Sequence, residues 1–162
     1  MDTDVPAKRW HKVINLLSLV LIIGSIVYAA ISYGNLPEKI PTHFNLKGEA
    51  DDWGNKGTIF LMPLIILPSY MVMYFLSKSP DSLNLNVKVT KENAPRVYAA
   101  ARSLMILLNF EIVVITAYIT WGMVQAGKGK NTLGIGVWDL PLMIGIVLGT
   151  VVYFMWKMKR LK

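Results

Sequence analysis

The sequence predicts an all-α integral membrane protein in which four helices cross the bilayer. Hydrophobic residues make up 54% of its 162 residues and charged residues only 17%, below the roughly 25% that is typical of soluble domains. Nearly all of the charge lies in the segments that connect four long apolar runs. The chain carries a net charge of +7, and its basic residues flank these runs unevenly on the two sides of the expected membrane.

The four apolar runs cover about residues 13–33, 58–76, 104–124 and 139–156. Each is close to the roughly 20 residues that a helix needs to cross a hydrocarbon core about 30 Å thick. Because backbone groups cannot stay unpaired in lipid, each run is expected to be helical. A cleaved signal ending before Ala30 is the alternative for the first run, but that run exceeds the roughly 7–15 residues of a signal core. We therefore expect one membrane domain over residues 1–162.

We expect a plasma-membrane protein, and the distribution of its basic residues predicts that both termini lie in the cytoplasm. Of the 17 Lys and Arg residues, twelve lie in the two terminal segments and the second connection, and five lie in the first and third connections. The side richer in Lys and Arg faces the cytoplasm. The aromatic residues agree with this orientation. Trp10 and Trp156 are expected at the inner interface, and Tyr33, Trp121 and Trp138 are expected at the outer one. The lipid bilayer, not nucleic acid, is the expected partner of the basic residues.

Two helices carry patterns that bear on packing. Gly145 and Gly149 have a spacing that lets helices approach closely, either within the chain or in a homo-oligomer. Pro63 and Pro68 remove backbone donors, so the second helix is expected to be kinked. Capping residues predict helix starts at two places: Thr90–Asn93 and Asp139.

Residues 34–57 are predicted to form a structured outer loop that is rich in turn-forming Gly, Asn and Pro. Its candidate residues for binding a ligand or partner are His43, Phe44, Asn45, Glu49, Asp51 and Trp53. Four of its side chains could hold a divalent metal: His43, Glu49, Asp51 and Asp52. The alternative is that these polar groups satisfy turns in a cap over the helix ends.

Glu111 is the second candidate site, because an acidic residue inside a span is costly and suggests a function. Tyr118 shares its helix face, and Asn109 lies on nearly the opposite face, so the third helix is expected to offer polar groups to two neighbours. The alternative is that Glu111 only joins helices through a hydrogen bond.

The sequence does not favour an enzyme. It has no cysteine, and its two histidines, His11 and His43, are expected on opposite sides of the membrane, where they cannot cooperate. It also has no glycine-rich phosphate loop and no zinc-binding HExxH helix.

The outer loop carries a motif of Leu-Pro, Ile-Pro, His-aromatic-Asn, Gly, acidic, aromatic and Lys positions. The residues are Leu36, Pro37, Ile40, Pro41, His43, Phe44, Asn45, Gly48, Glu49, Asp51, Trp53, Gly54 and Lys56. This pattern resembles the membrane-protein family called domain of unknown function 1648 (DUF1648). The resemblance covers about residues 13–76.

The same module forms the N-terminal part of SdpI-like immunity proteins. The resemblance implies a non-enzymatic sensor or immunity-type protein that acts at the outer face, with a secreted peptide or another membrane protein as its partner. It assigns no chemistry to the loop residues. Two alternatives stay open: a small oligomeric transporter or channel subunit that uses Glu111, and a metal-dependent membrane enzyme centred on His43.

Overall fold

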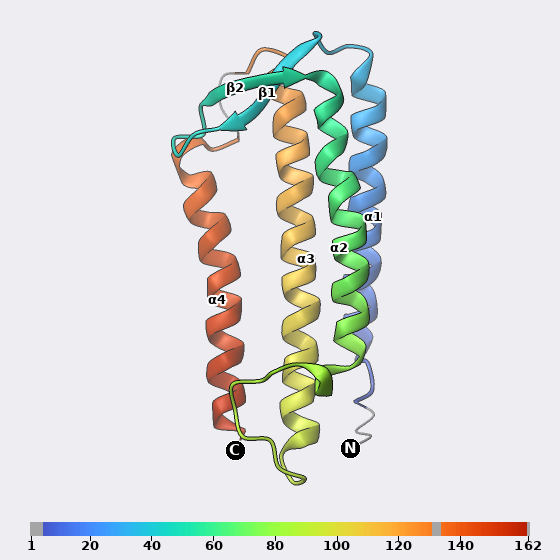
Figure 1. The fold of residues 1–162 in the computed structure, drawn as a ribbon, viewed down its shortest axis with the longest axis vertical. Coiled ribbons are helices and arrows are strands. Elements are labelled where there is room, and N and C mark those ends of the chain that lie inside the picture. The colour runs from blue at the N-terminus through green and yellow to red at the C-terminus, as the bar shows by residue number, and fades with distance from the viewer. Residues whose placement is uncertain (1–4, 131–133, 162) are drawn as a thin grey trace.

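The computed structural model describes residues 5–130 and 134–161. Four long helices run along its longest axis, and a two-stranded sheet covers one end (Figure 1). In chain order the helices and strands are α1 (Arg9–Tyr33), β1 (Lys39–Phe44), β2 (Ala50–Asn55), α2 (Leu61–Lys78), α3 (Ala94–Gly127) and α4 (Asp139–Arg160). Three short 3-10 helices join them: η1 (Lys56–Phe60), η2 (Pro80–Ser82) and η3 (Gly136–Trp138). The four helices are long and apolar enough to cross a membrane, so the predicted fold class is confirmed.

The bundle has two distinct ends. The sheet and the connection between α3 and α4 lie at one end, here called the hairpin end (Figure 1). Both chain termini and the segment 79–93 lie at the opposite end, here called the terminal end (Figure 1).

Helix α3 is the centre of the bundle, and it packs against α1, α2 and α4. Its 34 residues extend it to about 51 Å, longer than the hydrocarbon core, so it projects beyond the bilayer. It begins at Ala94, directly after the predicted Thr90–Asn93 start. The Asn93 side chain closes the preceding turn, because its Oδ1 accepts a hydrogen bond from the backbone N–H of Thr90 (2.8 Å).

Helix α4 packs mainly against α3, and it stands apart from α1 and α2 in Figure 1. At the terminal end the segment 79–93 reaches across to it. There Leu83 and Leu85 pack with Phe154 and Met158 of α4. The outward faces of the helices are apolar, as expected for surfaces that lipid covers.

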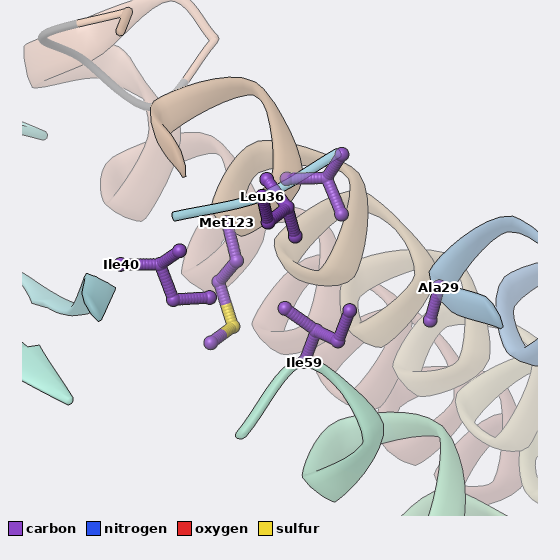
Figure 2. Close-up of a cluster of buried hydrophobic side chains, with 6 residues drawn as sticks. Ala29, Leu36, Ile40, Ile59 and Met123 are labelled. Carbon is purple, nitrogen blue, oxygen red and sulfur yellow. The ribbon is translucent and has the colours of Figure 1, made fainter. Parts of the chain in front are cut away.

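A buried cluster fixes the sheet to the end of α3. Its members are Ala29, Leu36, Ile40, Ile59, Met123 and Val124. Figure 2 shows side chains from the hairpin segment and η1 gathered around Met123 of α3. Since Ile40 and Ile59 are fully buried, the hairpin is part of the folded core and does not hang free.

The β-hairpin departs from the all-α prediction, which treated this segment as a loop. Strands β1 and β2 pair antiparallel from Lys39 opposite Asn55 to Phe44 opposite Ala50, with irregular register on both sides of His43. Pro41 lies within β1, and the irregular register breaks the alternation of inward and outward residues. Because of these features, the segment lacks the two-residue alternation by which a strand is predicted from sequence.

The fourth helix begins at Asp139 as predicted, but the predicted capping of that helix by the Asp139 side chain is wrong. Asp139 is the first residue of α4, and the cap position, Trp138, makes no side-chain capping bond. Pro63 lies in the first turn of α2, whereas Pro68 lies inside the helix. The kink expected at the prolines stays a prediction.

Candidate functional site

Asn45 builds the turn of the hairpin. Its Oδ1 accepts hydrogen bonds from the backbone N–H groups of Lys47 (2.8 Å) and Glu49 (3.1 Å). Its Nδ2 donates to Oε2 of Glu49 (3.0 Å). Gly48 completes the turn with a φ of 75°, which glycine adopts at no steric cost. Asn45 and Glu49 therefore shape the backbone.

His43 and Asp51 form the polar pair of the hairpin. Nδ1 of His43 lies 2.6 Å from Oδ1 of Asp51, and their side chains are 67% and 43% exposed. Such an exposed pair contributes at most about 1 kcal/mol to stability. The pair is therefore available for contact with another molecule at little cost to the fold.

Asp52 and Trp53 do not take part in the pair of His43 with Asp51. Asp52 accepts hydrogen bonds from the Thr42 hydroxyl (3.4 Å) and from the backbone N–H of Trp53 (2.9 Å). Trp53 is 55% exposed, and with Glu49 it lines a separate groove next to Lys130. Within residues 5–130 and 134–161, no three His, Cys, Asp or Glu side chains come close enough together to hold a metal ion. The four candidate ligands thus reduce to the pair of His43 with Asp51.

A pocket of about 560 Å³ lies beneath the hairpin. His43, Phe44, Asn45 and Asp51 line it from the hairpin side. The remaining walls come from α2, α3, η3 and α4 through Met62, Ile119, Gly136, Asp139, Leu140 and Met143. Four of the six residues predicted to bind a ligand or partner therefore share one cavity, while Glu49 and Trp53 lie outside it.

The polar residues of α3 face two neighbouring helices, as expected from their spacing. Asn109 is 2% exposed, and its Nδ2 donates to the backbone carbonyl of Tyr70 in α2 (3.2 Å). Glu111 accepts a hydrogen bond from the Thr150 hydroxyl in α4. Tyr118 donates from its hydroxyl to Asp139 at the start of α4.

A second pocket, of about 410 Å³, lies between α3 and α4. Glu111, Tyr118 and Asp139 supply its polar groups, and its remaining walls are apolar. Asp139 and Met143 also line the pocket beneath the hairpin, so the two cavities adjoin at these residues. This role of Asp139 is not apparent from the sequence, where an Asp before Pro141 is typical of a helix cap.

Four membrane-spanning helices with a motif-bearing hairpin at one end define a multi-pass membrane protein. The family described as "Domain of unknown function (DUF1648)" matches residues 20–67, which include the hairpin and parts of α1 and α2. These residues contain the motif on which the resemblance was based.

The chain is also similar to two known proteins. An uncharacterized protein of Archaeoglobus fulgidus is 25% identical over 142 residues, which cover 82% of this chain and 75% of that protein. The immunity protein SdpI of Bacillus subtilis is 28% identical over 94 residues, which cover 58% of this chain and 41% of SdpI. No solved structure matches the chain. Together these findings confirm the predicted resemblance to the DUF1648 family and to SdpI-like proteins.

Proposed function

We propose that this chain is an immunity-type membrane protein that binds a secreted peptide at the hairpin end. The observation that carries the proposal is the pocket beneath the hairpin, because four motif residues line it: His43, Phe44, Asn45 and Asp51. The relative named as an immunity protein supports the class.

The walls of this pocket indicate which peptide would bind. Phe44, Met62 and Leu140 offer apolar contact surface. Asp51, paired with His43, can accept a hydrogen bond from a cationic or N–H group. A volume of about 560 Å³ lies within the about 300–1,000 Å³ range of ligand sites and accommodates a few side chains. We therefore propose an amphipathic peptide with a cationic group as the ligand.

We also propose that the hairpin end faces outward and that the membrane is the plasma membrane. Both termini lie together at the terminal end (Figure 1). The segments at that end hold twelve of the 17 basic residues, so the positive-inside rule favours a cytoplasmic terminal end. A secreted peptide would then meet the hairpin first.

The test is protection of a bacterium that is sensitive to secreted antimicrobial peptides. Cells that express the chain should survive at least one peptide of a panel better than cells with an empty vector. Asp51→Asn and Phe44→Ala should reduce this protection. Asp52→Asn and Trp53→Ala are matched controls, because both residues lie in the same strand as Asp51 but do not line the pocket.

Two outcomes would contradict the proposal. One is unchanged sensitivity to every peptide of the panel while the protein is present in the membrane. The other is protection that the pocket variants and the control variants retain equally.

A further inference from the structure

The cleft between α3 and α4 contains two carboxylates with unusual surroundings. Asp139 is only 6% exposed, and its Oδ1 accepts the hydrogen bond from the Tyr118 hydroxyl. Among the described residues, its Oδ2 is buried and has no hydrogen-bond partner. The same holds for Oε2 of Glu111, which lies about two helical turns further into the bundle on the face of Tyr118.

No cation of the described chain neutralises these groups. The ion pairs found within residues 5–130 and 134–161 join His43 with Asp51 and Lys56 with Glu38, and neither includes Asp139 or Glu111. An unpaired polar oxygen in an apolar cleft costs free energy, and an unpaired charge costs more. A positively charged ligand group would remove that cost.

The apolar residues that line the cleft indicate that the rest of the ligand is apolar. Leu142 and Ile146 line the cavity and are 50% and 56% exposed on the apolar surface of the bundle. The cleft therefore opens toward the surface that lipid covers, and a ligand would enter it from the bilayer. Its volume of about 410 Å³ suits an alkyl chain more than a folded peptide.

We propose that the α3–α4 cleft binds a lipophilic ammonium ion, with the cationic head at Asp139 and the alkyl chain along α4 toward Glu111. The ammonium N–H groups would donate to the free Oδ2 of Asp139, while Tyr118 holds the other carboxylate oxygen in place. This site shares Asp139 and Met143 with the peptide pocket, but the hairpin contributes none of its described lining residues.

The test uses the full chain in nanodiscs of zwitterionic lipid and decylammonium as the probe, followed by isothermal titration calorimetry. Decanol and decanoate are matched probes with the same chain length and a neutral or negative head. Saturable binding of decylammonium, with no saturable binding of the other two, is expected. Because this comparison uses only the wild-type chain, it does not depend on the folding of any variant.

Variants then locate the site. Asp139→Asn keeps the side-chain shape and should weaken decylammonium binding by about tenfold or more, the scale expected when a buried charge partner is removed. Glu111→Gln should weaken it less, because Glu111 lies about two helical turns from the bound head. Glu38→Gln removes an exposed hairpin carboxylate and should leave the affinity unchanged. Equal binding of the three probes, or unchanged affinity of the Asp139 variant, would overturn the proposal. Neither result would bear on peptide protection, which is measured in cells.

Discussion

His11 is buried at the terminal end, and its ring joins α1 to α3. It is only 2% exposed, and its Nδ1 accepts a hydrogen bond from the backbone N–H of Lys8 (3.2 Å). The Ser103 hydroxyl donates to the Ala99 carbonyl (2.8 Å), so it accepts from Nε2–H of His11 (3.1 Å). These contacts define a neutral imidazole with its proton on Nε2. In the sequence His11 lies among basic residues, and this does not indicate that it joins two helices. The sequence does not show which helix packs beside His11.

We expect His11→Ala to lower the free energy of unfolding by about 1–3 kcal/mol, since Ser103 and the backbone of Lys8 would lose their buried partner. Thermal unfolding in mild detergent measures the change. His43→Ala is the matched control, and its effect should stay within about 0.5 kcal/mol because the His43 side chain is 67% exposed. A similar loss for both variants would show that the ring of His11 does not hold α1 to α3.

The hairpin turn and η3, the short helix before α4, meet through two glycines, Gly48 and Gly136. A Cβ atom on Gly48 would lie 2.8 Å from Cα of Gly136, and Gly48 has a positive φ. Both features exclude a side chain at this position. The contact connects the hairpin to the segment before α4 at the hairpin end.

Gly48→Ala is therefore expected to destabilise the hairpin by more than about 1 kcal/mol. Hydrogen exchange of the β1 and β2 amides should become faster, while exchange in α2 should change little. Gly24→Ala is the control, because Gly24 has no neighbouring atom within 4 Å of its added Cβ. Unchanged hairpin exchange in the Gly48 variant would be inconsistent with the close contact to Gly136.

Helix α4 leaves its glycine pair uncovered. A Cβ on Gly145 or Gly149 would meet nothing within 4 Å in the described part of the chain. The pair therefore makes no close helix contact within this chain, and self-association is the role that the spacing still predicts.

Gly145→Ile should abolish self-association in mild detergent, as measured by analytical ultracentrifugation. The thermal stability of the monomer should hold, because the added side chain points into open space. Ile144→Val, on the neighbouring exposed position, serves as the control. Identical sedimentation of the two variants and the wild type would show that α4 does not form the interface of self-association.

The sequence predicted the helices better than the hairpin for a physical reason. Apolar runs of membrane length have few alternatives to a helix in lipid, so length and composition suffice. The strands pair through backbone groups across the Asn45–Glu49 turn, and Pro41 and the irregular register conceal them. Likewise, helical spacing predicted that Glu111 and Asn109 face different neighbours. The pairing of Tyr118 with Asp139, however, follows only from the packing of α4 against α3.

At the scale of the whole molecule, the two ends differ in their number of basic residues. The absence of cysteine in the sequence makes their sidedness directly measurable. We expect Asp52→Cys to react with a membrane-impermeant maleimide in intact cells. Lys159→Cys should react only after the cells are permeabilised. Both residues are exposed, so the opposite labelling pattern would invert the proposed orientation.

The cluster in Figure 2 also sets an order of events during biosynthesis. The segment that matches the family ends at residue 67, but the buried cluster beneath the hairpin includes Met123 and Val124 of α3. These residues leave the ribosome nearly 60 residues later, a delay of roughly 3–12 s at typical rates of synthesis. Until then Ile40 and Ile59 lack their partners from α3. The segment that the family description matches is thus shorter than the segment that packs together, and the third helix must be made before the hairpin has all of its buried partners.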